Sequence, residues 1–457
     1  MTGAMLQLPA QLKRRLQGQL KDTFIRFQAA LNDPAPVSIR MNPGKPISHI
    51  GDSEAIPWSE EGRYLSSRPR FTDDPLFHAG TYYVQEASSM FLEYMLRNII
   101  DLSANHRVLD LSAAPGGKST HLQSLLTRDS LLVANEVIGS RNKILRQNLS
   151  RWGGDNHIVT QSDPKFFNKL PSFFDLILVD APCSGEGLMR KDPHAIQEWS
   201  QSNVQLCARR QKRILADVLP ALAEGGVLIY STCTFSEAEN EENLEWLEQE
   251  SGLEPIKLNI PSEWGVVQTG PIGAGYRFYP HLTQGEGFFI TALRKPGSAH
   301  KHKTAKKKNA RIPATDTTED RNWLKETERY AFINREEHHS AIPRVLYADY
   351  LSVQRALRIT SAGLYMGKMY HHKLKPSPEM ALSQALKQEI PRIEFSQDEA
   401  LNFLAHIEIP KNKDYPEGYV LIVYQGHGLG WLHVLRNGQI RNKYPTAWRI
   451  LQRHPKD

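Results

Sequence analysis

Two of the chain's three cysteines stand where a reactive thiol could meet a bound substrate. Cys183 lies in DAPCSGEG and Cys233 in STCTF, and each directly follows an apolar run with the pattern of a buried strand. Cys207 instead lies in NVQLCARRQKRIL at core-facing helical spacing, where free cysteines are commonly buried and inert. Thiols among small polar residues at strand ends indicate covalent catalysis, which divides one difficult step into easier ones.

The stretch LDLSAAPGGKST, residues 109–120, follows an apolar run and contains a glycine-rich turn. It partly matches the phosphate-binding pattern G-x-x-x-x-G-K-[ST]. Counting back from Gly117 places Ser112 where the first glycine is required, and Pro115 has no N–H group to offer a phosphate. An enzyme that hydrolyses ATP or GTP with Mg²⁺ is therefore a disfavoured alternative, and it leaves the two cysteines unexplained.

Acidic residues end the next predicted strands, and ligands of open parallel sheets bind beyond such strand ends. Glu136 lies about 25 residues past the first loop, an interval at which an acidic residue commonly accepts hydrogen bonds from ribose hydroxyls. Asp163 ends the third strand and is placed for an adenine amino group. Small residues in SAAPGG let the backbone approach a ligand. A nucleoside ligand without phosphate is predicted, and S-adenosyl-L-methionine fits that description.

A methyl donor beside two cysteines points to methylation of carbon 5 of a pyrimidine. Carbon 5 of cytosine is too weak a nucleophile to attack a methyl sulfonium until a thiolate adds to carbon 6. A base must then remove the carbon 5 proton so that the thiol can leave. Asp180, at the end of the fourth strand, is the candidate to stabilise charge near N3 of the cytosine. The target base must leave its stack to enter such a pocket.

Strands that alternate with helices must position these residues, so we expect an α/β fold with a doubly wound, mostly parallel sheet. The runs VLDL, LILV and VLIY suit strands that are buried on both faces. The expected strands are RVLDLS, LLVANE, HIVTQSD, FDLILVDAPC, GVLIYSTCTF and GFFITALRK. The expected helices are KSTHLQSLL, SRNKILRQNLSRWG, NVQLCARRQKRILADVLPALAEGG and EENLEWLEQE.

The chain divides into a central catalytic unit and flanking regions. We expect an N-terminal α/β accessory domain for RNA binding over 1–90 and a methyltransferase domain over 91–296. A basic linker over 297–320 leads to a C-terminal RNA-binding region over 321–457 that ends in short strands with Gly-rich turns. The linker contains KHKTAKKKNAR, which is either a solvated tether or a segment that contacts phosphates.

Composition limits the classes of protein and partner. A chain of 457 residues with 40% hydrophobic residues can form two or three globular domains. Its net charge of +6 suits a polyanionic partner. Because no apolar run approaches the roughly 20 residues of a membrane span, and no signal core is visible, we expect a cytoplasmic protein. No C-x-x-C pair occurs, so neither a metal site nor a disulfide is expected.

Several motifs together resemble the Nop/Sun family of RNA cytosine-5 methyltransferases. The strongest matches are SAAPGGK, DAPCSGEG and STCTFSEAENE, and VSIRMNP, YYVQEASSM and RFYPHLTQGEGFF are also similar. Within the family, the chain resembles the bacterial RsmF-type 16S rRNA enzymes, whose C-terminal PUA-like module is matched by GLGWLHVLRNGQIRNKYPTAWR. The resemblance implies a Rossmann-like class I methyltransferase domain followed by a PUA-like domain.

The resemblance also implies a role for each site residue. Cys233 would add to carbon 6, Cys183 would assist release of the methylated product, and Asp180 would contact the cytosine beside the cofactor. Ser112 stands where the family often has cysteine or aspartate, with little expected effect, and Lys118 would organise the site. The residues expected to bind S-adenosyl-L-methionine are Ser112, Ala113, Ala114, Pro115, Gly116, Gly117, Lys118, Glu136, Asp163 and Asp180.

The expected partner is RNA, with 16S rRNA or the small ribosomal subunit as the target. The enzyme is expected to be a monomer. The same chemistry on transfer RNA or large-subunit rRNA stays open. A non-enzymatic RNA-binding factor for ribosome assembly is a further alternative, although Cys183, Cys233 and Asp180 are all intact. Arg277 and His281 either contact RNA or are satisfied within the fold.

Overall fold

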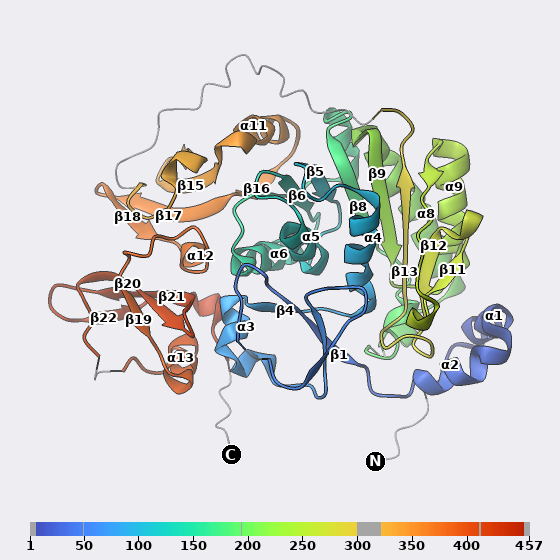
Figure 1. Ribbon diagram of the computed structural model, residues 1–457, viewed down its shortest axis with the longest axis horizontal. Coiled ribbons are helices and arrows are strands. Elements are labelled where there is room, and N and C mark those ends of the chain that lie inside the picture. The colour runs from blue at the N-terminus through green and yellow to red at the C-terminus, as the bar shows by residue number, and fades with distance from the viewer. Residues whose placement is uncertain (1–5, 49, 193, 299–320, 411–412, 452–457) are drawn as a thin grey trace.

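The computed structural model describes residues 6–48, 50–192, 194–298, 321–410 and 413–451. A ten-stranded sheet forms its centre (Figure 1), in the order β11-β12-β13-β9-β8-β5-β6-β7-β16, with β10 paired to β13. The basic run 301–311, for which the sequence leaves open both a solvated tether and a phosphate-contacting segment, lies outside the described residues.

The parallel strands form the middle of this sheet and confirm the predicted doubly wound fold. From β5 the chain proceeds outward through β6 and β7 on one side, then through β8 and β9 on the other. The crevice at this reversal, between β5 and β8, is where such sheets bind ligands. The strands are β5 (Arg107–Asp110), β6 (Leu131–Asn135), β7 (His157–Thr160), β8 (Phe174–Asp180) and β9 (Leu222–Thr232).

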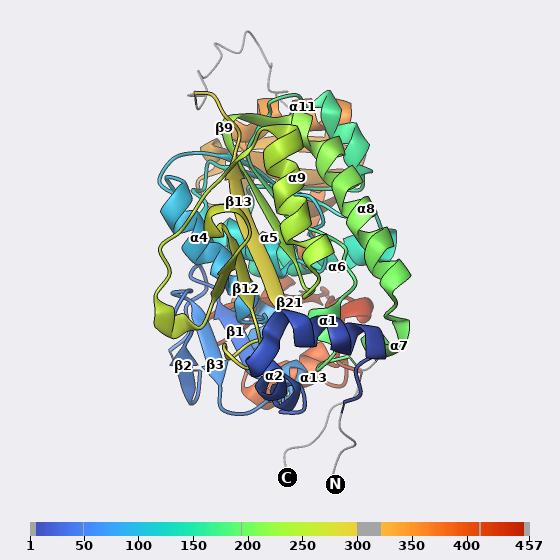
Figure 2. The same cartoon turned by 90° about the vertical axis from the view of Figure 1, so that its right-hand side faces the viewer.

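Helices cover both faces of the sheet because the strands are apolar on both sides (Figures 1 and 2). In β6, Leu132 and Ala134 pack in one core, whereas Leu131 and Val133 pack in the other. The first core is covered by α4 (Phe91–Ile99), α5 (Gly117–Leu125) and α6 (Gly139–Trp152). The second is covered by α8 (Gln201–Val218), α9 (Glu241–Ser251) and α11 (Tyr347–Ala356).

The predicted helix over 203–226 was wrong at its C-terminal end. Helix α8 ends at Val218, a short 3-10 turn contains Pro220, and β9 begins at Leu222. Proline lacks the N–H group that a continuing helix needs, which explains the early end.

Antiparallel strands extend the sheet at both edges. At one edge lie β13 (Phe288–Arg294), β12 (Gly275–Phe278), β11 (Val267–Thr269) and β10 (Glu254–Pro255). At the other edge β16 (Ile359–Ala362) pairs with β7. The region 321–457 therefore contributes a strand to the central sheet, an association that the local sequence pattern did not indicate.

The N-terminal part packs two helices and a small sheet against the central domain. Helices α1 (Ala10–Leu20) and α2 (Phe24–Ala30) precede a sheet of order β2-β3-β1-β4. Leu12, Leu16 and Phe27 pack with Met189 and Phe235, which flank the two cysteine loops. The sheet and its helix comprise β1 (Val37–Met41), β2 (Ser53–Ala55), β3 (Gly62–Leu65), α3 (Pro75–Ala79) and β4 (Tyr82–Val84).

Two four-stranded sheets follow residue 321, and the second has the Gly-rich turns that the sequence predicts. The first contains β14 (Tyr330–Arg335), β15 (His338–Pro343), β17 (Leu364–Tyr370) and β18 (Lys373–Pro376), followed by α12 (Pro378–Ala381). The second contains β19 (Arg392–Glu394), β20 (Gly418–Tyr424), β21 (His427–Val434) and β22 (Ile440–Asn442), with α13 (Gln397–Leu404) packed on it.

None of the helices in the described residues is both long and apolar enough to cross a membrane.

Candidate active site

The two cysteines that the sequence singles out meet at the carboxyl ends of adjacent parallel strands. Cys183 follows β8 and Cys233 follows β9, and their Sγ atoms lie 3.2 Å apart. Both are free thiols and half-buried, whereas Cys207 is buried on α8. Residues 50 positions apart in the chain are thus brought into contact at one edge of the sheet.

A buried carboxylate fixes the loops that carry these thiols. Glu239 accepts hydrogen bonds from the backbone N–H and the hydroxyl of Ser184, which follows Cys183. It also accepts from Thr234, which follows Cys233, at 3.3 Å, and from Gln211 of α8 at 2.9 Å. Burial raises the pKa of Glu239, and these donors oppose that rise because they stabilise the charged form. One side chain therefore connects both cysteine loops to the fold.

The environment of the Cys183 thiol favours its protonated form. The hydrogen bond to Cys233 and burial together raise the pKa of the Cys183 thiol well above its usual value, and the charge of Glu239 adds to this effect. Cys183 therefore retains its proton at neutral pH and can donate an S–H hydrogen bond to the sulfur of Cys233.

Asp180 and Lys118 form an ion pair beside the cysteines. Lys118 Nζ, in the first turn of α5, lies 2.8 Å from Asp180 Oδ2 at the end of β8. Ser231 donates to the other carboxylate oxygen at 2.8 Å. Burial opposes the charge on Lys118, but Asp180 outweighs it, so the pKa of this ammonium is raised. Lys118 is thus held by a carboxylate, and its role in organising the site stays a prediction.

The glycine-rich loop lines a cavity of about 180 Å³ at the switch point of the sheet. Residues 83–86 and Ser89 of the N-terminal part also line this cavity. Gly116 adopts φ 118° where the loop enters α5, a conformation that glycine reaches without strain. The predicted site residues in its lining are Ser112, Ala113, Ala114, Pro115, Gly117, Lys118 and Asp180.

Glu136 and Asp163 do not line this cavity. Glu136 is buried at the end of β6, where it accepts from the N–H of Ile138 at 2.8 Å and lies 3.6 Å from Arg141. Asp163 accepts from the N–H of Lys165 and caps a 3-10 helix. Glu136 directly follows β6 as predicted, whereas β7 ends at Thr160 and Asp163 lies three residues beyond it. The contact of both residues with a cofactor stays a prediction.

Sequence reasoning missed Asp110, which lies inside the cavity lining. It ends β5, is fully buried, and accepts from the Ser119 hydroxyl at 2.6 Å, while its Oδ1 has no hydrogen-bond partner in the described part of the chain. Burial raises the pKa of Asp110 to about 7. An acidic residue that ends the apolar run VLD, directly before the loop, was the available signal.

Two exposed apolar side chains were missed as well. Val137 and Ile138 follow Glu136 directly, and their side chains are 48% and 49% exposed. Apolar surface of this kind beside a polar strand end offers a face for a planar ring.

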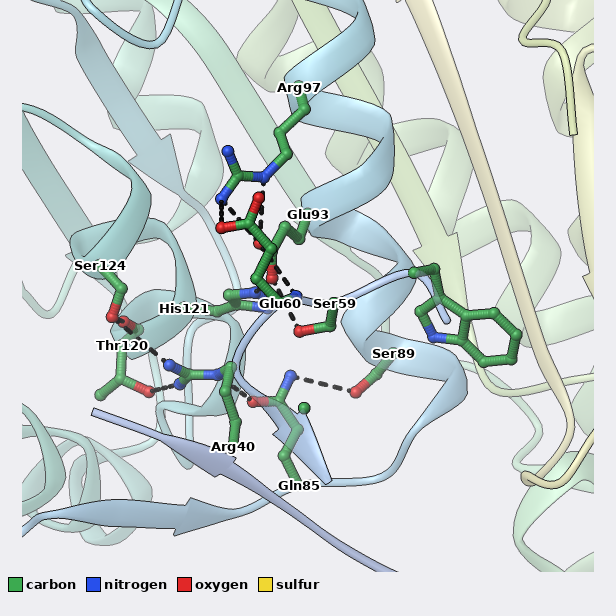
Figure 3. Close-up of polar contacts among 12 residues, drawn as sticks. Arg40, Ser59, Glu60, Gln85, Ser89, Glu93, Arg97, Thr120, His121 and Ser124 are labelled. Atoms are coloured by element: carbon green, nitrogen blue, oxygen red, sulfur yellow. Dashed lines mark hydrogen bonds and ion pairs between the residues drawn. The ribbon is translucent and has the colours of Figure 1, made fainter. Parts of the chain in front are cut away.

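The N-terminal domain holds the start of α5 through a buried arginine (Figure 3). Arg40 of β1 donates to Gln85 at 2.9 Å and to Thr120 at 2.6 Å, and it reaches the carbonyl of Gly117 at 3.3 Å. Its guanidinium also lies 4.4 Å from the Trp152 ring centroid. The loop that lines the cavity is therefore fixed from outside the central sheet.

Beside Arg40, Figure 3 shows a second polar cluster around Glu93 of α4. His121 Nε2 lies 3.1 Å from Glu93, which also accepts from Ser59 at 2.7 Å and from Arg97. This cluster joins α4, α5 and the N-terminal sheet.

Arg277 is satisfied within the fold, which decides between the two roles left open by the sequence. Only 2% of its surface is exposed, it is ion-paired with Glu241, and it donates to the carbonyl of Phe235 at 2.9 Å. His281 packs against Phe27, with ring centroids 5.6 Å apart.

Three sequence families match consecutive parts of the chain. The family described as 16S rRNA methyltransferase RsmB/F matches residues 97–294. The N-terminal domain of 16S rRNA methyltransferase RsmF matches residues 8–87, and the RsmF PUA domain matches residues 390–450.

Curated relatives extend this similarity over most of the chain. Ribosomal RNA small subunit methyltransferase F of Aeromonas salmonicida is 31% identical over 425 residues, covering 88% of this chain and 89% of that protein. Its namesake from Pectobacterium atrosepticum is 38% identical over 251 residues. That match covers 54% of this chain and spans about half, 51%, of the relative.

Solved structures share the central fold. The methyltransferase homolog protein from Pyrococcus horikoshii has a TM-score of 0.52 at 33% identity, covering 60% of this chain and 91% of that chain. NSun6 from the same organism, solved with SFG, has a TM-score of 0.54 at 22% identity and covers 65% of this chain and 100% of that chain. At this identity the match supports the fold alone.

Proposed function

Because the chain belongs to the RsmF family of 16S rRNA methyltransferases, we propose that it methylates carbon 5 of a cytosine in small-subunit rRNA through a covalent bond to Cys233. S-adenosyl-L-methionine is its methyl donor. The observation that carries the cytosine chemistry is the pair of thiols, 3.2 Å apart, at the ends of β8 and β9. Hydrolysis of a nucleoside triphosphate does not need two thiols in contact.

The cavity beside the thiols fits a cationic methyl donor. S-adenosyl-L-methionine carries an ammonium and a sulfonium group, and Asp110 presents a buried carboxylate oxygen without a hydrogen-bond partner in the described residues. We propose that Asp110 and the loop 112–118 hold its methionine end and Glu136 its ribose. Val137 and Ile138 would contact the adenine ring, and Asp163 its amino group. When bound, this group supplies an electrophilic methyl.

The cysteines then divide the reaction between them. The Cys233 thiolate forms the bond from its Sγ to carbon 6 as the double bond between carbons 5 and 6 opens, while Asp180 stabilises the charge that develops near N3. The electron pair of that bond makes carbon 5 nucleophilic, so carbon 5 takes the methyl group and the sulfonium is left as a neutral thioether. After a base removes the carbon 5 proton, the electron pair re-forms the ring double bond and the carbon 6–sulfur bond breaks, which returns Cys233 as a thiolate. Cys183, with its proton and its contact to Cys233, assists this release.

We further propose that RNA is held by the regions 1–90 and 321–457, which precede and follow the catalytic domain 91–296 in the sequence. The match of residues 390–450 to an RsmF PUA domain supports this assignment. In Figure 1 the N-terminal sheet and the C-terminal module lie side by side, and His427 of β21 contacts the carbonyl of Pro46 at 3.0 Å. The two flanking regions are therefore in contact with each other.

Nucleoside analysis by mass spectrometry tests this function. The purified protein is incubated with S-adenosyl-L-methionine and, separately, with small subunits, large subunits and transfer RNA that lack 5-methylcytosine. We expect 5-methylcytidine in small-subunit RNA with the native chain and with the matched control Cys207→Ala, and none with Cys233→Ala. Modification by Cys233→Ala at the native rate, or a methyl group on another position, overturns the proposal. Formation of 5-methylcytidine in another RNA pool would change the proposed target but leave the proposed chemistry intact.

A further inference from the structure

A second cavity lies away from the cysteines, between the central sheet and the first sheet of the C-terminal region. Its volume is about 350 Å³. Helix α6 and strand β16 form one side, while β14, β15 and β17 form the other. The side chains that give it its chemistry are Arg146, Arg335, His338, Ser340, Tyr350 and Tyr365.

Its lining contains basic side chains and no carboxylate. Arg146 is half-buried, its Nε is shielded from solvent, and it forms neither a hydrogen bond nor an ion pair within the described ranges. Arg335 is exposed and donates to the Tyr350 hydroxyl at 2.7 Å. Because a partly shielded guanidinium without a hydrogen-bonded ion-pair partner is costly, such a site favours an anion.

Two carboxyl groups influence this cavity from outside its lining. Glu337 is ion-paired with Lys368 and lies 3.8 Å from His338 Nε2. Glu379 interacts electrostatically with Arg146, but no ion pair joins the two side chains in the described ranges. Neither arginine of the lining therefore has an ion-pair partner among the described residues.

The same lining offers rings on which a base can stack. His338 and Tyr365 have ring centroids 5.8 Å apart at 32°, and His338 Nδ1 lies 2.8 Å from the Tyr365 hydroxyl. Ser340 and Tyr350 add hydroxyl groups that can contact a sugar. Arginine beside aromatic rings is the combination with which proteins hold a single-stranded nucleotide.

Helix α6 connects this cavity to the cofactor loop. Arg141 and Asn148 donate to the carbonyls of Ala114 and Pro115, both at 2.8 Å. Arg146 lies about 140° around the helix from Arg141, because each residue advances the helix by about 100°. One face of α6 therefore supports the loop, and the opposite face lines the cavity.

We propose that this cavity binds one nucleotide of the RNA substrate, with its phosphate against Arg146 and Arg335 and its base against Tyr365. The inference rests on RNA as the substrate of the proposed function, but it does not depend on the cysteine chemistry. A nucleotide held here anchors a single-stranded part of the RNA away from the cytosine that enters the active site.

Equilibrium binding of the full chain to a fluorescent single-stranded oligoribonucleotide tests the proposal at several salt concentrations. The variant is Arg146→Gln/Arg335→Gln. The matched control is Arg355→Gln, an exposed residue of α11 outside the lining. We expect the double variant to bind about tenfold more weakly, with a salt slope lower by about 0.7 to 1.4, since each single-strand phosphate contact contributes about 0.7. Affinity for S-adenosyl-L-methionine is expected to stay at the native value.

Equal RNA affinity and salt slope in the double variant and the control overturn the inference, while RNA binding by the native chain leaves the proposed function intact. Absence of RNA binding by the native chain contradicts both.

The native protein, crosslinked by light to RNA that contains 4-thiouridine, gives a readout that no variant's folding can affect. Crosslinks to Tyr350 or Tyr365 support the cavity, and crosslinks confined to other segments overturn it. An excess of cytidine monophosphate that abolishes those crosslinks, while inorganic phosphate does not, supports a site for a whole nucleotide rather than for phosphate alone. Phosphate competition equal to that of the nucleotide overturns the nucleotide assignment.

Discussion

Replacing Asp110 with asparagine is expected to stabilise the cofactor-free protein at alkaline pH and to weaken cofactor binding. The Asp110 carboxyl group is fully buried, and burial raises its pKa from 3.8 to about 7. The unfolded chain loses this proton near the lower value, whereas the folded chain keeps it up to the higher value. Between the two, the folded state binds more protons, so the stability of the wild-type protein falls as pH rises from about 4 to about 7.

The magnitude follows from the size of the pKa shift. A rise of about 3 units corresponds to about 4 kcal/mol of destabilisation above pH 7, at about 1.4 kcal/mol per unit. In Asp110→Asn this ionisation is absent, and the Ser119 hydroxyl retains an acceptor. The new amide N–H group lacks a partner, which costs about 1 kcal/mol. The variant is therefore expected to gain about 3 kcal/mol at about pH 8 and to lose about 1 kcal/mol at about pH 4.

Urea unfolding at both pH values measures this difference, with Asp52→Asn as an exposed control of the same chemistry. The relevant transition is the one that shifts when S-adenosyl-L-methionine is added, since it reports on the central sheet. Calorimetry should also show that cofactor affinity rises with pH through about 7 in the native chain and that Asp110→Asn removes this dependence. Equal stability of variant and native chain at the higher pH would refute the assignment of a buried, unpaired charge.

Two further predictions concern positioning residues. In Glu239→Gln, an amide N–H group replaces a carboxylate oxygen and faces the N–H donors of Ser184 and Gln211, so we expect the turnover rate for methylation to fall more than tenfold while KM for the cofactor stays unchanged. The exposed control Glu237→Gln should show the kinetics of the native chain. A fall in the turnover rate of both variants would contradict the role of Glu239. Arg40→Met leaves Gln85 and Thr120 without their hydrogen-bond partner, so we expect urea unfolding to show a loss of about 3 kcal/mol in stability. The exposed control Arg355→Met should lose less than about 0.5 kcal/mol. Equal losses in the two variants would contradict the structural role of Arg40.

The sequence was sufficient to predict the elements whose pattern is local. The runs VLDL, LILV and VLIY are apolar on both faces and form parallel strands, so residues at their ends, including Cys183 and Cys233, had to share one edge of the sheet. Pro220 marks the turn after α8, but the apolar spacing continues past this proline and by itself predicts a longer helix. The local sequence pattern thus predicted an element correctly where the apolar periodicity and the residues that end the element indicated the same boundary.

Features that depend on contacts between distant segments could not be predicted in this way. The pairing of β16 with β7 joins residues about 200 positions apart. Glu239 appeared only as part of the motif STCTFSEAENE, and its hydrogen bonds to both cysteine loops follow from the fold of α8 and β9 around it. The sequence shows Asp110 only as a polar residue at the end of a strand. That its Oδ1 is buried without a hydrogen-bond partner in the described residues follows from the fold.

The central claim is tested most directly by trapping the covalent intermediate. Cys183→Ala is mixed with S-adenosyl-L-methionine and small-subunit RNA, and denaturing gels with mass spectrometry are used to detect protein bound to RNA. Because addition by Cys233 proceeds while release fails, we predict that an adduct accumulates and that its RNA is attached at Cys233. The double variant Cys183→Ala/Cys233→Ala should form none. An adduct of equal yield in the double variant, or attachment at another residue, would contradict the assignment of Cys233 as the nucleophile.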